Sequence, residues 1–160
     1  MINIARFLPL ITVVAWLITL ALPVLDSGNG HGPRIVVTSL GGDPFDLAGI
    51  ELPFVLAWIG ILGCAVTVWL LRSLTWWSVV AVLVTIALVA LGAQLITDPP
   101  TLIWGGVDDQ GRPTGGMERG EPVAGALVWL LGIAALATAA VCGFLGSRRV
   151  RRVQRLSNAG

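Results

Sequence analysis

Four long stretches without an acidic, basic or histidine side chain constrain this chain more than any other feature. Each is long enough to cross about 30 Å of hydrocarbon as a helix, which takes about 20 residues. With 56% hydrophobic and 12% charged residues, a soluble fold would leave far too much apolar surface in water. The sequence therefore predicts an all-α integral membrane protein in which residues 1–160 form one four-helix bundle. The predicted spans are residues 7–25, 52–71, 75–97 and 123–146.

The first span has to be distinguished from a cleavable signal peptide, because it follows a short N-terminus that carries Arg6. Its apolar run exceeds the usual 7 to 15 residues of a signal peptide, and no A-x-A cleavage site follows. We therefore expect a retained span. Pro23 is expected to kink or end this helix.

Acidic and basic residues occupy different segments. All nine acids lie in residues 26–51 and 98–122, whereas seven of the ten arginines lie at the termini or between the second and third spans. Because cytoplasmic flanks of membrane helices retain arginine, both termini are expected in the cytoplasm and the two acidic loops outside. The exclusive use of arginine over lysine indicates a GC-rich bacterial genome. The predicted location is thus the bacterial inner membrane.

The basic tail, residues 147–160, and the arginine of the short turn are interpreted as topology anchors. Near anionic headgroups each arginine contributes about 1 kcal/mol, so membrane lipids are predicted partners. Nucleic acid is not, because neither a folded binding module nor interleaved aromatic residues accompany the charge. Docking of a cytoplasmic protein is the alternative. The arginines concerned are Arg72, Arg148, Arg149, Arg151, Arg152 and Arg155.

Small residues recur at helical spacing in three of the spans. Lipid supplies no hydrophobic drive between helices, so small side chains that let backbones approach closely are what a packed bundle needs. Sevenfold spacing favours a left-handed supercoil. We expect helix-packing seams here, which meet either another helix of this chain or another protein. The predicted interface comprises Gly125, Gly132, Ala135, Ala139, Gly143 and Gly146 in the fourth span and Ser78, Thr85 and Gly92 in the third; the first span offers Ala5, Thr12 and Thr19.

Tryptophans fall into two groups. Trp69, Trp76 and Trp77 flank the turn around residue 72 and fit an aromatic belt at the membrane interface. The second group lies deeper and is interpreted as packing in the outer half of the bundle. The alternative is a groove for a lipid or quinone. This group comprises Trp16, Trp58 and Trp129.

The loops carry signals for short strands and for helix starts. Branched and aromatic residues at 34–40 and 101–107 predict strands that form a small hairpin or sheet. Gly111 is expected to take a positive φ in a turn. Proline in a first helical turn and a preceding carboxylate both favour a helix start, so we expect helices to begin at the pairs Glu51 with Pro53 and Glu121 with Pro122.

No catalytic, cofactor or metal site is predicted. The single histidine, His31, lies in a glycine-rich loop, and no residue near Cys64 or Cys142 completes a metal set. The acids Asp108, Asp109 and Glu118 suit a hard cation chemically but match no calcium-loop spacing, and we interpret them as solvated. Coupled transport is disfavoured because the predicted spans hold no charged residue.

These observations predict a non-catalytic accessory or scaffold subunit of a larger bacterial inner-membrane complex. Its expected partners are membrane lipids and other integral membrane subunits. The first alternative is a module that binds lipid or another hydrophobic ligand in the tryptophan groove. The second is a small oligomeric channel or exporter lined by threonines and Gln94.

Overall fold

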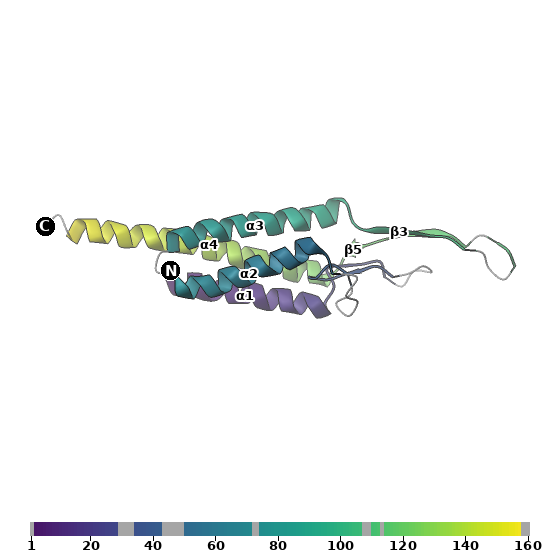
Figure 1. Cartoon of the computed structure of the whole chain (residues 1–160), viewed down its shortest axis with the longest axis horizontal. Coiled ribbons are helices and arrows are strands. Elements are labelled where there is room, and N and C mark those ends of the chain that lie inside the picture. Colours follow the sequence, from purple (N-terminus) through teal and green to yellow (C-terminus); the bar gives the residue numbers. More distant parts are fainter. Residues whose placement is uncertain are drawn as a thin grey trace.

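Four helices form the body of the protein. The computed structural model describes residues 2–28, 34–42, 50–71, 74–106, 110–112 and 114–157. All four helices are long and apolar enough to cross a membrane, which indicates a multi-pass membrane protein. They lie side by side along one axis, with both chain ends at one end of the bundle, the terminal end, and the sheets at the other, the loop end (Figure 1). The helices are α1 (Ile2–Ala21), α2 (Leu52–Leu70), α3 (Leu74–Thr97) and α4 (Ala124–Ser157).

Two of the predicted spans agree closely with the observed helices. The bounds of α2 and α3 lie within one residue of the sequence prediction, and Pro53 lies in the first turn of α2 behind the N-cap residue Glu51. In contrast, α1 begins five residues before the expected position and ends at Ala21, ahead of Pro23. Arg6 therefore lies inside a membrane-length helix, which the sequence analysis did not expect.

The predicted fourth span began at residue 123, close to the observed start of α4, but the expectation that Glu121 and Pro122 open the helix was wrong. Glu121 and Pro122 form a strand, and α4 begins at Ala124. Glu121 pairs with Asp26 and Pro122 with Leu25 in an antiparallel ladder, so strand pairing overrides the helix-start signal of the proline. At its other end α4 continues through the basic tail to Ser157, and it extends beyond the other three helices (Figure 1).

The main helix contacts close a ring in the order α1, α2, α3, α4. The contact between α1 and α4 is the most extensive, and the contact between α3 and α4 is next. One stripe of each helix is buried, as Phe54, Ile61 and Val68 show at sevenfold spacing on α2. The opposite faces carry exposed leucine, valine and isoleucine. This pattern is expected of a small bundle whose outer surface meets lipid.

Glycines of α4 permit close contact with α1 and with the residues that directly follow it. A Cβ at Gly125 would lie 2.1 Å from the carbonyl oxygen of Pro23, and one at Gly132 would lie 3.0 Å from the Cβ of Ala15. The Thr12 hydroxyl donates a 2.9 Å hydrogen bond to the carbonyl oxygen of Gly132, where both residues are buried. The α1–α4 seam therefore combines van der Waals contact with an interhelical hydrogen bond.

The remaining seam residues have different surroundings. A Cβ at Gly143 would lie 2.6 Å from the Ser78 hydroxyl, so this glycine contacts α3. Ala139 and Gly146 are buried, whereas Ala135, Thr85 and Gly92 are partly buried.

We predict that Gly125→Ala lowers the free energy of unfolding by about 2 kcal/mol, because the added methyl group collides with backbone atoms that cannot rotate away. The matched control is Gly63→Ala on α2, where an added Cβ meets nothing within 4 Å. Unfolding in mixed micelles of increasing denaturing detergent measures both. Equal stability of the two variants would contradict the close contact.

Two small sheets form the loop end. In the first, β1 (Leu25–Asp26) is the central strand between β2 (Val36–Val37) and β5 (Glu121–Pro122), so it joins the two loops. In the second, β3 (Thr101–Trp104) and β4 (Gly116–Arg119) pair as an antiparallel hairpin. The predicted strands at 34–40 and 101–107 are shortened to β2 and β3. Gly111 has a φ of 75°, as expected for its turn.

An ion pair closes the loop between β1 and β2. Arg34 Nε donates a 2.9 Å hydrogen bond to Asp26 Oδ1, and a second guanidinium nitrogen of Arg34 contacts Oδ2. The Gly28 amide also donates to Oδ1, at 2.9 Å. The hydrogen bond from Arg34 is the main cause that lowers the pKa of Asp26 from 3.8 to about 2.

We predict a pH-dependent contribution of this pair to stability. Because the pKa of Asp26 is lowered in the folded state, its stabilising effect is complete above pH 3.8 and disappears as the pH falls toward about 2. The wild type should therefore unfold at a higher temperature than Asp26→Asn at pH 6, with the difference shrinking through this window. Arg34→Gln should abolish the same pH dependence. A difference that stays constant down to pH 2 would refute the assignment.

Candidate functional site

An aromatic cluster fills the loop-end half of the bundle. The Trp16 ring lies 4.5 Å from the Trp129 ring and 5.6 Å from the Trp58 ring, measured between centroids. Phe54 packs edge-on against Trp129 at 6.0 Å. Both residues are buried, with exposed fractions of 0% for Trp16 and 2% for Trp129. Trp16 thus packs against both of the other tryptophans named from the sequence, and Trp129 also borders a cavity between α3 and α4.

A buried turn covers this cluster. Ser39 is 0% exposed, and its hydroxyl donates a 3.0 Å hydrogen bond to the carbonyl oxygen of Trp16 in α1. The Ser39 amide donates to the Thr19 carbonyl oxygen at 3.3 Å, and the Trp58 indole nitrogen donates to the Ser39 carbonyl oxygen at 2.9 Å. Ser39 therefore joins α1 and α2. Sequence reasoning missed this residue because a serine after a short apolar run carries no signal of burial.

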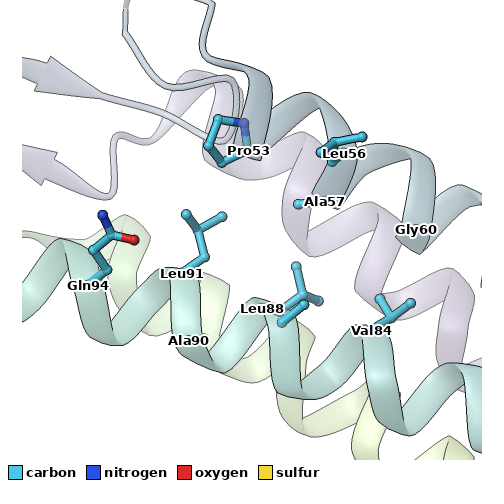
Figure 2. A pocket seen from close by; sticks show the side chains of 10 residues that line it. Pro53, Leu56, Ala57, Gly60, Val84, Leu88, Ala90, Leu91 and Gln94 are labelled. Atoms are coloured by element: carbon cyan, nitrogen blue, oxygen red, sulfur yellow. The ribbon is translucent and has the colours of Figure 1, made fainter.

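A cleft opens between α2 and α3, with a volume of about 410 Å³. The two helices meet where a Cβ at Gly60 would lie 3.3 Å from Val84, and they separate toward the loop end (Figure 2). Gln94 supplies the polar side chain of the lining, at the wide end of the cleft (Figure 2). Its remaining lining residues are Pro53, Leu56, Ala57, Ala87, Leu88, Ala90 and Leu91.

The threonines expected to line a pore use their hydroxyl groups within the bundle. Thr12 donates to Gly132 of α4, and Thr19 donates to the carbonyl oxygen of Trp16 at 2.9 Å. Thr67 and Thr85 donate to carbonyl oxygens one turn earlier in their own helices. Each of these hydroxyls therefore already has an acceptor.

The β3–β4 hairpin projects away from the helices at the loop end (Figure 1). Ile103 and Met117 are directly paired across it, and they are 81% and 64% exposed. Paired residues lie on the same face of a hairpin, so the two form one apolar surface, the Ile103–Met117 face. On the opposite face the Trp104 ring covers Gly116, where a Cβ would lie 3.0 Å from the ring.

The basic residues lie mainly at the terminal end. The Arg148 guanidinium stacks over the Phe144 ring at 4.3 Å, and the Arg6 guanidinium lies 5.8 Å from the Trp69 ring centroid. The helix continues past Arg149, Arg151, Arg152 and Arg155 to Ser157. Arg72 lies outside the described residues.

Among the residues that the structure describes, no group of three histidine, cysteine, aspartate or glutamate side chains is placed to hold a metal ion. Cys64 and Cys142 are free thiols. His31, Asp108 and Asp109 lie outside the described residues. No protein-family model, curated protein or solved structure matches the chain.

Proposed function

We propose that this chain is a non-catalytic accessory or scaffold subunit of a larger complex in a bacterial inner membrane. This proposal rests on the Ile103–Met117 face of the hairpin, which is the surface that a partner protein would cover. In this arrangement both termini are cytoplasmic and the hairpin lies on the outer side. Lipids and other membrane subunits surround the helices.

Apolar side chains are exposed both on the helices and on the hairpin. On the helices, exposed leucine and valine meet hydrocarbon in a membrane and therefore need no partner. The hairpin projects beyond the helices, so Ile103 and Met117 have no such environment. Apolar surface exposed to water costs about 25 cal/mol per Å², and a protein partner removes that cost.

The stability of the hairpin supports the same reading. An isolated two-stranded ribbon is only marginally stable in water. Among the described residues, β3 and β4 pair with each other alone, so each has an open edge. A partner that covers the apolar face or extends the sheet stabilises the ribbon. The surface is thus better suited to a protein contact than to a small ligand.

A second candidate, binding of a hydrophobic ligand, is favoured by the cleft between α2 and α3. Its volume of about 410 Å³ is within the usual range of ligand sites, and its lining is apolar apart from Gln94. Filling the cleft with Ala57→Phe should reduce retention of such a ligand and leave the hairpin contacts unchanged.

We predict that a photo-crosslinking amino acid at position 103 yields a discrete protein adduct in native membranes, because the partner covers this face. The same probe at Leu83, a lipid-facing residue of α3 that is 62% exposed, should label lipid instead. Immunoblotting and mass spectrometry identify the adducts.

The double substitution Ile103→Ser with Met117→Ser should release the crosslinked protein during gentle purification. Leu102→Ser is the matched control, because it removes an apolar side chain from the opposite face of the same strand. A stable lone monomer with no adduct at position 103, or equal release by the control, would contradict the proposal.

A further inference from the structure

A second cavity lies between α3 and α4 at the loop end, with a volume of about 210 Å³. Its walls include Val89, Gly92 and Ile96 of α3 and Trp129 and Leu130 of α4. Val89, Ile96 and Leu130 are each more than half exposed on the bundle surface. The cavity is therefore accessible from the side, where the membrane lies.

One polar group faces this otherwise apolar space. The Trp129 side chain is 2% exposed, and its indole nitrogen has no hydrogen-bond partner among the described residues. A Cβ at Gly92 would lie 3.8 Å from that nitrogen. Gly92 and Trp129 both line the cavity, so the buried indole nitrogen lies beside this space with no side chain of residue 92 in between. A buried donor without an acceptor is unfavourable, and Trp129 borders a cavity from which an acceptor outside the chain could reach it.

Water is poorly suited to supply that acceptor. A buried water molecule is held by two to four polar partners. The side chains of the cavity walls offer the indole N–H as their only polar group, so a water molecule there would lack the side-chain partners that usually hold it. A charged ligand is equally unsuited, because no ionisable side chain lines the space. The requirement is a neutral acceptor atom on a hydrocarbon body.

The depth of the indole nitrogen in the membrane limits which acceptor groups of a ligand can reach it. Trp129 lies five residues inside the start of α4, and Gly92 lies five residues inside the end of α3. Five residues correspond to about 7.5 Å along a helix. The apolar part of α4, Ala124–Arg148, has 25 residues and spans about 37 Å, longer than the hydrocarbon core of about 30 Å. The indole N–H therefore lies about 4 Å inside the hydrocarbon boundary, close to the ester groups of lipids.

We propose that this cavity binds an ester-linked acyl chain of a membrane lipid, with the Trp129 indole N–H donating a hydrogen bond to the ester carbonyl oxygen. The chain fills the apolar space between α3 and α4, and the headgroup remains at the loop end. This site differs from the α2–α3 cleft and does not depend on the hairpin contact. It makes one lipid a specific component of the bundle.

The test compares lipids that differ only in the carbonyl group. The protein is reconstituted in an equimolar mixture of diacyl phosphatidylglycerol and its dialkyl ether analogue of equal chain length, and retained lipids are counted by native mass spectrometry. One hydrogen bond corresponds to a preference of roughly fivefold for the ester lipid. No preference in the wild type would overturn the proposal.

Two substitutions test whether the preference for the ester lipid depends on the Trp129 indole N–H. Trp129→Phe keeps an aromatic ring and removes the donor, so the ratio should fall to about one. Trp16→Phe is the matched control, because it removes another buried indole N–H without a partner in the same cluster, from a ring that does not line the cavity. Trp16→Phe should keep the wild-type ratio. Retention of the preference in Trp129→Phe, or its equal loss in Trp16→Phe, would overturn the assignment.

Gly92→Val provides an independent variant that keeps Trp129. Its side chain extends toward the indole nitrogen and fills the space that the acyl chain requires. The ester preference should be lost while the thermal unfolding transition remains. If Trp129→Phe does not fold, this variant alone decides: a lost preference supports the site, and a wild-type ratio refutes it.

Discussion

Close contact between the backbones of α1 and α4 is the interaction on which the rest of the bundle depends. Lipid is as apolar as leucine, so helices in a membrane gain no hydrophobic free energy from meeting each other. Their association is stabilised by van der Waals packing and interhelical hydrogen bonds instead. Gly132 brings α4 against α1, Gly125 brings it against Leu22 and Pro23 directly after α1, and Thr12 bonds across the seam. Through Gly143 the same helix contacts α3, so α4 links the two sides of the ring.

The loop end is fixed to the helices by a small number of bonds. Strand β1 follows α1 directly and holds β2 and β5, which fixes the end of α1 relative to the start of α4. Ser39 adds bonds to α1 and α2. The β3–β4 hairpin joins α3 to α4, the two helices that border the cavity beside Trp129. The hairpin is therefore connected along the chain to both helices that border this cavity.

The success of sequence reasoning varied with how local the signal was. The bounds of α2 and α3 follow from apolar runs that end at polar residues, so they were predicted closely. The start of α1 was missed because Arg6 lies within the helix, where its guanidinium stacks near Trp69. Glu121 and Pro122 were wrongly expected to open α4, because Pro122 pairs with Leu25, a residue 97 positions earlier. The burial of Ser39 depends on Trp16 and Trp58, which no local pattern indicates.

By itself, the sequence determined the number of membrane-length helices, because a backbone in hydrocarbon must satisfy its own hydrogen bonds within each apolar run. It also determined that small residues recur at helical spacing. Tertiary structure decided which of these residues meet α1 and which meet α3. It also decided that the Ile103–Met117 face points outward and that the Trp129 N–H faces Gly92. Such outcomes depend on groups far apart in the chain, whose proximity exists only after the helices pack.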